Sequence, residues 1–343
     1  MERSVQNHFS TGEGISCINC MSHSTENLYQ YKKTSLIRAS DDFYPDHEYS
    51  HTVHIINVAY NSLFLREICL PDWDMFHSKH PSGYLHGAAR AVSGGMIYVS
   101  DKPGHHDAAL LSKLVLKDGS ILRASQSGVP TRDCLFADVG RDGVSALKIW
   151  NINDNSNVGI VAAFNVQGVQ WSFDNRQNVV NNESPRQVHA AVRAEDVEKF
   201  RGMDGRFVAY SHRSQSLTLL DTCAAEIDIP LKHREWELVS ISPMYELKKI
   251  LFSPIGLVDM FNSGGAITSM EIDQSLLRVE LQCRGSGRFL VYSSDPPSKV
   301  TLGEHRSAKS LPFQFNPESG ELCVTLDDEV NVTHRMLVIQ WSR

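Results

Sequence analysis

Three short apolar runs in the first third of the chain each end in one or two carboxylates, the groups that most often donate or accept protons or attack as nucleophiles in enzymes. A fourth apolar run of similar length carries a thiol instead of a carboxylate near its end. The runs are Ser35–Asp42 with Asp41 and Asp42, Ile68–Asp74 with Asp72 and Asp74, Met96–Asp101 with Asp101, and Ile15–Met21 with Cys20.

The pair of carboxylates after Arg38 is the first candidate for acid and base chemistry. Side chains alternate across a strand, so only one of Asp41 and Asp42 is able to point fully into a site at the strand end. That residue would act as a general acid, with Arg38 holding substrate hydroxyls or tuning the local charge. The alternative is that Ser40-Asp41-Asp42 forms a helix cap or a turn.

An indole between two carboxylates, in Leu70-Pro71-Asp72-Trp73-Asp74, suits a sugar. The apolar face of a pyranose packs on Trp73 while the carboxylates accept hydrogen bonds from its hydroxyls. The alternative is a turn begun by proline, with Trp73 in the core.

The segments between these runs have helical spacing, as in His51–Arg66 and Ser82–Ser93. Carboxylates at the ends of several strands joined by helices are typical of a (β/α)₈ barrel, where catalytic groups gather at the carboxyl ends of the strands. A doubly wound sheet shows the same alternation of strands and helices, but the repeated acidic strand ends favour the barrel for residues 1–140.

From residue 141 to residue 343 the pattern predicts an antiparallel β-sandwich, because short runs rich in β-branched and aromatic residues are separated by turn residues. The segment Arg284–Gly287, with two glycines, predicts a hairpin turn. The expected strands are Ala146–Ile152, Val158–Val166, Arg206–His212, Trp236–Ile241, Leu277–Cys283, Arg288–Ser293, Glu321–Thr325 and Met336–Trp341.

Composition narrows the class of partner. The chain has 343 residues, enough for two domains, and a formal net charge of −7, which disfavours nucleic acid and anionic membranes as partners. Seven cysteines in a long chain predict free thiols in a reducing compartment, with the cytosol as the default location. We expect neither a signal peptide at Met1–Gly14 nor a membrane span. The sequons at Asn182 and Asn331 would then be accidental.

No metal or cofactor site is expected. The histidine pairs at His51/His54 and His105/His106 do not fall into a zinc signature, and Cys17 and Cys20 lack a second pair at zinc spacing. No nucleotide-binding loop or nucleophile elbow is found in the sequence.

Several longer motifs, in one order, resemble the family of raffinose synthases, seed imbibition proteins and alkaline α-galactosidases (glycoside hydrolase family 36, clan D). The likeness weakens over about the last hundred residues. The motifs are Cys20-Met21-Ser22-His23, Arg38–Phe43, Pro71–Phe76, Tyr98–Gly104, Leu116–Arg123, Pro130–Phe136 and Leu147–Asn151.

This resemblance implies that residues 1–140 are the C-terminal half of a (β/α)₈ barrel and that a β-domain follows. It also implies retaining chemistry with one aspartate as nucleophile and another as acid/base, without a cofactor. Asp41 best matches the acid/base position, with Asp42 as the alternate because the doublet permits a shift of one residue. Arg38, Trp73, Asp74 and Cys20 match positions at the galactose pocket.

The family nucleophile, in a Lys-x-Asp motif upstream of the segment equivalent to Ile15–Met21, has no match in this sequence. Glu2–Phe9 resembles the end of the helix after that strand, so Met1 is interpreted as an internal methionine of a longer product. A retaining mechanism needs two carboxyl groups about 5–5.5 Å apart, so the isolated chain would turn over poorly.

Two functions stay open at this stage. The first is galactosyl transfer from galactinol to sucrose or, as an α-galactosidase, to water from raffinose-type sugars; the short Arg38–Pro45 form favours the alkaline α-galactosidase and seed imbibition branch. The second is a non-catalytic remnant or a carbohydrate-binding fragment. The location would be cytoplasmic, or plastidial if a transit segment precedes the chain, and the oligomeric state is undetermined.

Overall fold

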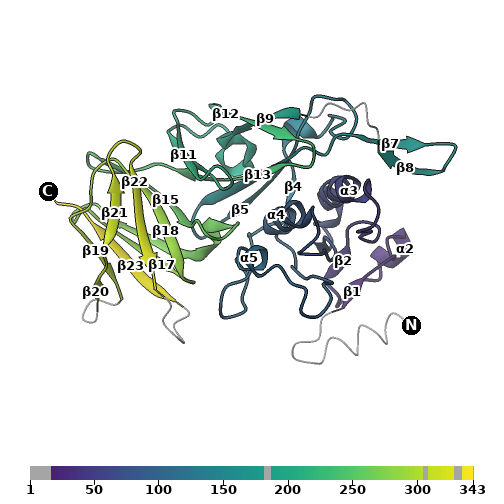
Figure 1. Cartoon of the computed structure of the whole chain (residues 1–343). Coiled ribbons are helices and arrows are strands. Elements are labelled where there is room, and N and C mark those ends of the chain that lie inside the picture. Colours follow the sequence, from purple (N-terminus) through teal and green to yellow (C-terminus); the bar gives the residue numbers. More distant parts are fainter. Residues whose placement is uncertain (1–16, 181–186, 304–307, 328–333, 343) are drawn as a thin grey trace.

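The computed structural model describes residues 17–180, 187–303, 308–327 and 334–342 (Figure 1). The segment Glu2–Phe9, expected to end a helix, and the sequons at Asn182 and Asn331 lie outside these residues. The helices occupy one end of the molecule and two layers of C-terminal strands occupy the other, with a further sheet between them (Figure 1).

A three-stranded parallel sheet organises the first part of the chain. Its order is β1-β2-β3, so strands that follow one another in sequence are also neighbours in space. The strands β2 and β3 are shorter than the apolar runs that predicted them, because only three residues of each run pair. The strands are β1 (Ile18–Asn19), β2 (Leu36–Arg38) and β3 (Leu70–Asp72), and the helices are α2 (Thr25–Leu28), α3 (Ser50–Leu65), α4 (Gly83–Ser93) and α5 (Ala108–Leu111).

The two long helices agree with the helical spacing of the sequence to within one residue at each end. Helix α3 returns the chain from β2 to β3, which lets the two strands run parallel. Helix α4 ends at Gly94, whose φ of 70° is the left-handed conformation that glycine adopts without strain. A Cβ at Gly94 would lie 1.7 Å from the carbonyl oxygen of Gln126, so the helix end also needs glycine for space.

The run Met96–Asp101, expected as a further strand, forms only one parallel bridge, between Val99 and Phe76. Val99 nevertheless lies beside the segment after β3, so Tyr98 is placed at the same end of the sheet as Arg38 and Asp72.

An antiparallel six-stranded sheet, in the order β11-β10-β13-β6-β5-β4, packs behind the helices (Figure 1). One face, with Ile149, Ala162 and Leu238, shares a hydrophobic core with α3 and α4, and the other face, with Val161 and Val239, packs under β9 and β12. The strands are β4 (Val129–Pro130), β5 (Leu147–Asn153), β6 (Val158–Phe164), β10 (Phe207–Ser211), β11 (Ser216–Leu220) and β13 (Trp236–Pro243), with β9 (Gln187–Arg193) and β12 (Glu226–Lys232) as a separate pair.

Two small features complete this region. The hairpin of β7 (Val169–Ser172) and β8 (Gln177–Val180) projects beyond α3, at the opposite end of the molecule from the C-terminal sheets (Figure 1). Short 3₁₀ helices cover Arg132–Cys134, Ala194–Asp196, Glu198–Phe200 and Ser263–Ala266.

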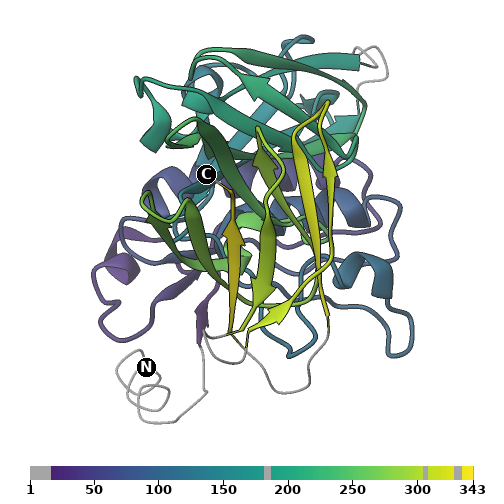
Figure 2. The same cartoon turned by 90° about the vertical axis from the view of Figure 1, so that its left-hand side faces the viewer.

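Two antiparallel five-stranded sheets form a sandwich at the C-terminal end, facing the viewer in Figure 2. Residues from both sheets, such as Phe289 and Leu337, meet in one hydrophobic core. The first sheet, in the order β14-β15-β18-β22-β21, contains β14 (Tyr245–Leu247), β15 (Ile250–Leu257), β18 (Gly287–Ser293), β22 (Glu321–Leu326) and β21 (Phe313–Asn316). The second, in the order β16-β17-β23-β19-β20, contains β16 (Ile267–Asp273), β17 (Arg278–Cys283), β23 (Arg335–Gln340), β19 (Lys299–Leu302) and β20 (Lys309–Ser310).

The prediction that Arg284–Gly287 forms a hairpin turn is wrong. The strands on either side of it, β17 and β18, do not pair with each other but lie in different sheets. Gly285 and Gly287 have φ angles of 84° and 127°, so this segment turns sharply and carries the chain from one layer of the sandwich to the other. The two glycines therefore allow a backbone conformation that a crossover between the two sheets requires, and not that of a hairpin.

The structure thus shows parallel strands joined by helices in the first part and mainly antiparallel sheets after it. The division into 1–140 and 141–343 stays a prediction, and the helix core joins residues from both sides of it. Among the described residues no helix is both long and apolar enough to span a membrane.

Candidate active site

Arg38, the last residue of β2, stands at the centre of a cluster of three carboxylates. It is in register with Asp72 of β3, so the two side chains project on the same face of the parallel sheet. Arg38 Nε donates to Asp72 Oδ2 at 2.8 Å, and Nη1 lies 2.9 Å from Asp74 Oδ2 and 3.3 Å from Asp42 Oδ1. The side chain of Asp72 is 0% exposed and that of Asp42 is 62% exposed, so the cluster holds two buried carboxylates and one that faces solvent.

The hydroxyl of Tyr98 closes the cluster by donating to Asp72 Oδ2 at 2.7 Å. Burial, followed by this bond and the charge of Asp72, raises the pKa of Tyr98 above its usual value, which keeps the phenol a donor. Burial alone would lower the pKa of Arg38, but the bond to Asp72 and the charge of Asp74 raise it overall. The guanidinium therefore stays charged.

Asp74 connects the turn after β3 to the loop after β2. Its Oδ2 accepts a hydrogen bond from the backbone N–H of Phe43 at 2.8 Å as well as facing Arg38. Asp74 has a φ of 65°, a left-handed conformation that costs energy for a residue with a side chain. Its surroundings must hold this turn in place.

Arg90 of α4 holds that turn from behind. Its guanidinium is fully buried and Nη2 reaches three consecutive carbonyl oxygens, those of Trp73 at 2.7 Å, Asp74 at 3.3 Å and Met75 at 3.1 Å. Burial lowers the pKa of Arg90 to about 10, which still leaves it charged at neutral pH. A positive group aimed at three carbonyls fixes the backbone that presents Asp74 to Arg38.

Buried histidines extend this support towards the loop after β2. Arg90 Nη1 lies 2.9 Å from His86 Nδ1, so His86 carries its proton on Nε2 and donates it to His51 Nδ1 at 2.9 Å. His51 in turn donates from Nε2 to the carbonyl of Pro45 at 3.1 Å. Each group in this series donates a hydrogen bond to the next, from Arg90 on α4 to the loop that carries the Asp41–Asp42 pair.

The two adjacent carboxylates of the loop point to different surroundings. Asp42 contacts Arg38, whereas Asp41 bonds to Asn57 on α3, and burial raises the pKa of Asp41 above its usual value. The geometry thus brings the alternate residue, Asp42, to the Arg38 cluster. A raised pKa is the property expected of a general acid, and this observation favours Asp41.

A cavity of about 750 Å³ opens beside these carboxylates. Cys20, directly after β1, lines it together with Asp41 and Asp42, so the strand neighbouring β2 reaches the same space. The volume falls within the range of about 300–1,000 Å³ that is typical of small-molecule sites.

Trp73 does not lie at the cavity. Its ring is 1% exposed, belongs to the core between the parallel sheet and the helices, and donates from Nε1 to Ser62 of α3 at 3.1 Å. The expectation that a sugar stacks on this indole is therefore corrected: alternation along the strand places Trp73 on the face opposite Asp72.

Asp101, the third carboxylate at a strand end, is not brought to Arg38 either. It accepts hydrogen bonds from the backbone N–H and the hydroxyl of Ser78 and from His106. It ties together two loops, whereas Tyr98, three residues earlier, reaches the cluster. Among the described residues, no group of three or more histidine, cysteine or acidic side chains could hold a metal ion, and all seven cysteines are free thiols.

The motif residues around Thr131 and Lys148 have a structural role. Lys148 of β5 is buried, and its Nζ lies 2.8 Å from Asp196 and 2.9 Å from Asp133. This charge network links the segment after β4 to the β9 region, away from Arg38.

Sequence reasoning missed the parts played by Tyr98, His86 and Arg90. One signal was present: Arg90 is the single arginine among the small and apolar residues of Gly87-Ala88-Ala89-Arg90-Ala91-Val92. A charged residue in such a stretch is either exposed or holds a buried polar network.

The model of the family described as raffinose synthase or seed imbibition protein Sip1 matches residues 1–326. The chain belongs to this family. A probable galactinol–sucrose galactosyltransferase 6 of Arabidopsis thaliana is 43% identical over 332 residues, covering 94% of this chain and 43% of that protein. A stachyose synthase of Pisum sativum is 34% identical, covering 86% of this chain and 35% of that protein. The chain thus spans less than half the length of these relatives.

Two solved structures of other proteins can each be superimposed on part of this chain. A candidate α-galactosidase from Bacteroides fragilis gives a TM-score of 0.43 at 12% identity, over 66% of this chain and 47% of that chain. The α-galactosidase I of Mortierella vinacea gives 0.39 at 8% identity, over 61% and 53%.

Proposed function

We propose that this chain supplies the acid/base carboxylate and part of the sugar pocket of a retaining enzyme that transfers galactosyl groups from galactinol to sucrose. The observation that carries the proposal is the Arg38 cluster, where a guanidinium fixed by two buried carboxylates holds a third, exposed carboxylate at the edge of a cavity. The name of the Arabidopsis thaliana relative supplies the galactosyl donor and acceptor.

In this proposal Asp42 is the acid/base. It would protonate the glycosidic oxygen as the bond to the galactosyl group breaks, and would then remove the proton from the incoming acceptor hydroxyl. Arg38 positions Asp42, while Asp72 and Asp74 hold Arg38 from the buried side. Asp41 stays as the alternative, since its pKa is raised.

The second carboxylate of a retaining pair would come from an upstream strand in the longer family members. The three parallel strands with returning helices would then form part of a (β/α)₈ barrel completed by that region. The chemistry requires no cofactor. The cytoplasmic location remains a prediction from the seven thiols, and a plastidial location would require a transit segment upstream.

A second function is favoured by the burial of Asp72 and Asp74. Because both are ion-paired and closed to solvent, neither is free to attack a sugar. On its own the 343-residue chain would then be a carbohydrate-binding piece without turnover. The same catalytic groups would also hydrolyse raffinose-type oligosaccharides if water replaced sucrose as the acceptor of the galactosyl group.

The first experiment uses a chain extended upstream to include the family's Lys-x-Asp segment. Incubation with galactinol plus sucrose should yield raffinose, and incubation with raffinose alone should release galactose if water is accepted. No product from either mixture would refute the galactosyl-transfer proposal. Turnover of an aryl α-galactoside by the 343-residue chain alone would refute the carbohydrate-binding alternative.

The acid/base assignment is tested by Asp42→Asn, with Asp41→Asn as its matched control. Asp42→Asn should lower galactinol turnover by about 10²–10⁴-fold. It should lower turnover of an aryl galactoside with a good leaving group much less, because that bond needs little protonation. The same selective pattern in Asp41→Asn, with Asp42→Asn near wild type, would transfer the role to Asp41.

A further inference from the structure

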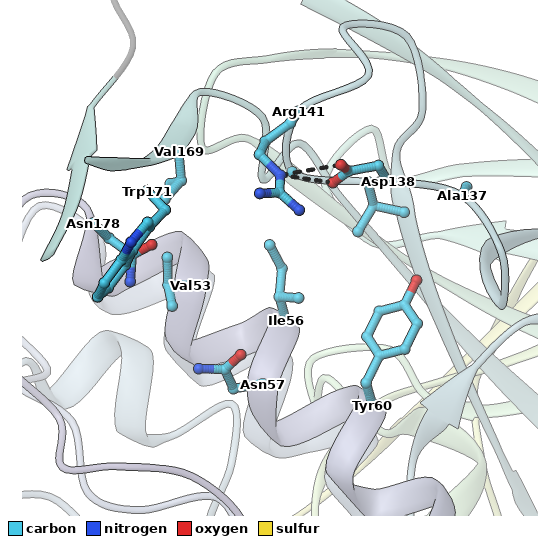
Figure 3. Close-up of a pocket in the computed structure, with 12 residues that line it drawn as sticks. Val53, Ile56, Asn57, Tyr60, Ala137, Asp138, Arg141, Val169, Trp171 and Asn178 are labelled. Atoms are coloured by element: carbon cyan, nitrogen blue, oxygen red, sulfur yellow. Dashed lines mark hydrogen bonds and ion pairs between the residues drawn. The ribbon is translucent and has the colours of Figure 1, made fainter. Parts of the chain in front are cut away.

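We propose that a second cavity, on another side of α3 from Arg38, binds one ring of a neutral sugar. It has a volume of about 290 Å³ and lies between α3, the segment 137–141 and the β7–β8 hairpin (Figure 3). The proposal does not depend on the galactosyl-transfer function.

The floor of this cavity is a stripe of α3 at the edge of the hydrophobic core. Val53, Ile56, Asn57 and Tyr60 follow the spacing i, i+3, i+4, i+7 and so share one face of the helix. All four are half-buried, and Ile56 and Tyr60 also pack against the core, whose fully buried residues on α3 include Val58. A stripe that combines aliphatic, amide and phenol groups offers a ligand both apolar contact and hydrogen bonds.

Trp171 of β7 forms one end of the cavity and Tyr60 stands at the other end (Figure 3). The indole is 40% exposed, in contrast to the buried ring of Trp73. An exposed aromatic ring at the side of a small cavity presents a flat apolar surface to the C–H face of a pyranose. The hairpin thus provides the stacking surface that the sequence had assigned to Trp73.

The polar groups around the cavity suit a ligand that is uncharged and rich in hydroxyls. Arg141 Nε pairs with Asp138 at 3.0 Å, so the two charges cancel locally. The terminal nitrogens of Arg141 lie on the cavity side of the pair (Figure 3). The amide of Asn178 adds donors and an acceptor at the wall, and the amide of Asn57, which also bonds to Asp41, lies at the floor. Tyr60 donates its hydroxyl proton to the carbonyl of Cys134, which leaves the phenol oxygen available as an acceptor.

The size of the cavity limits the ligand. A volume of about 290 Å³ is at the lower end of the range of roughly 300–1,000 Å³ for small-molecule sites, which suits one sugar ring with the rest of an oligosaccharide outside. Tyr60 also lines the larger cavity beside Asp41, so the two cavities are neighbours around α3.

The test measures binding of raffinose, and separately of sucrose, to the 343-residue chain by saturation-transfer NMR. Trp171→Ala should weaken binding by about tenfold or more, since it removes the stacking surface. The matched control is Phe173→Ala, on the same hairpin. Phe173 is 84% exposed and does not line the cavity, so its removal should leave affinity unchanged.

Asp42→Asn separates this site from the Arg38 cluster, because it alters the larger cavity only. Binding that is lost in Trp171→Ala and kept in Phe173→Ala and Asp42→Asn supports the proposal. An affinity that is the same in wild type and Trp171→Ala but is reduced by Asp42→Asn places the sugar in the larger cavity and overturns the proposal, and so does an absence of binding of either sugar to the wild-type chain. Neither result depends on whether an extended chain transfers galactosyl groups.

Discussion

Two arginines lie on opposite sides of the same turn after β3, and their surroundings differ in kind. Arg38 is bound by carboxylates, two buried and one exposed, and its pKa is raised. Arg90 is enclosed by backbone carbonyls and by His86, and burial lowers its pKa to about 10. One arginine, Arg38, thus holds carboxylates next to a cavity, whereas the other, Arg90, holds backbone carbonyls inside the core.

The difference shows how the candidate site is kept in shape. The carboxylates at Arg38 need a turn with Asp74 in a left-handed conformation, and Arg90 stabilises that turn through its carbonyl oxygens. Both arginines are therefore positioning residues: Arg38 acts on the side chain of Asp42, whereas Arg90 acts on the backbone of the turn that carries Asp74. Replacing Arg38 and replacing Arg90 should therefore change the stability of the protein by different amounts.

The largest expected effect is the replacement of Arg90 by lysine. A single ammonium group is too compact to serve three carbonyls and His86 at once, so Arg90→Lys should lower the free energy of unfolding by about 3 kcal/mol. Arg38→Lys is the control and should cost only about 1–2 kcal/mol, because one ammonium still sits among carboxylates. Urea denaturation of the two variants measures both values. Equal losses would remove the distinction between the two arginines.

The next effect is a pH dependence of the free energy of unfolding, which arises from the buried histidines near Arg90. Burial, followed by the charge of Arg90, lowers the pKa of His54 to about 3, and burial lowers that of His51 to about 4. Between pH 6.5 and these values the unfolded chain binds more protons than the folded one, so stability is full above pH 6.5 and falls with acidification.

Each of these histidines should contribute a slope of up to about 1.4 kcal/mol per pH unit in that window. Denaturant midpoints measured between pH 7.5 and 4.5 would show the slope, and His54→Gln should reduce it by about one proton. Above pH 7.5 the two slopes should agree. An unchanged slope in His54→Gln would mean that the buried imidazole is protonated on both sides of the transition.

The smallest effect concerns the placement of Trp73. Ser62→Ala removes the acceptor of the buried indole N–H and should cost about 1–2 kcal/mol, with no change in sugar affinity. Ser214→Ala, at an exposed hydroxyl pair, is the control and should be close to neutral. A change in raffinose affinity in Ser62→Ala, with stability unaltered, would show that Trp73 contributes to sugar binding after all.

Much of the local structure was predictable. The helices α3 and α4 followed from their spacing, and alternation along the strand indicated that Asp41 and Asp42 would not share the same surroundings. These inferences work because helical period and strand alternation depend only on neighbours along the chain. The glycines of Arg284–Gly287 marked a sharp turn correctly, but the pairing of the flanking strands depends on which sheet each one joins.

By itself the sequence determined the family, the carboxylates at the strand ends and the residues that form the long helices, because motifs and periodicity are properties of the chain. Only the tertiary structure decided that Asp42 contacts Arg38 while Asp41 contacts α3, and that Trp73 is buried. It alone joined His51 to His86, 35 residues apart, and exposed Trp171 beside α3. The physical reason is that burial, ion pairing and backbone support arise from packing between elements distant in sequence, whose geometry no local pattern specifies.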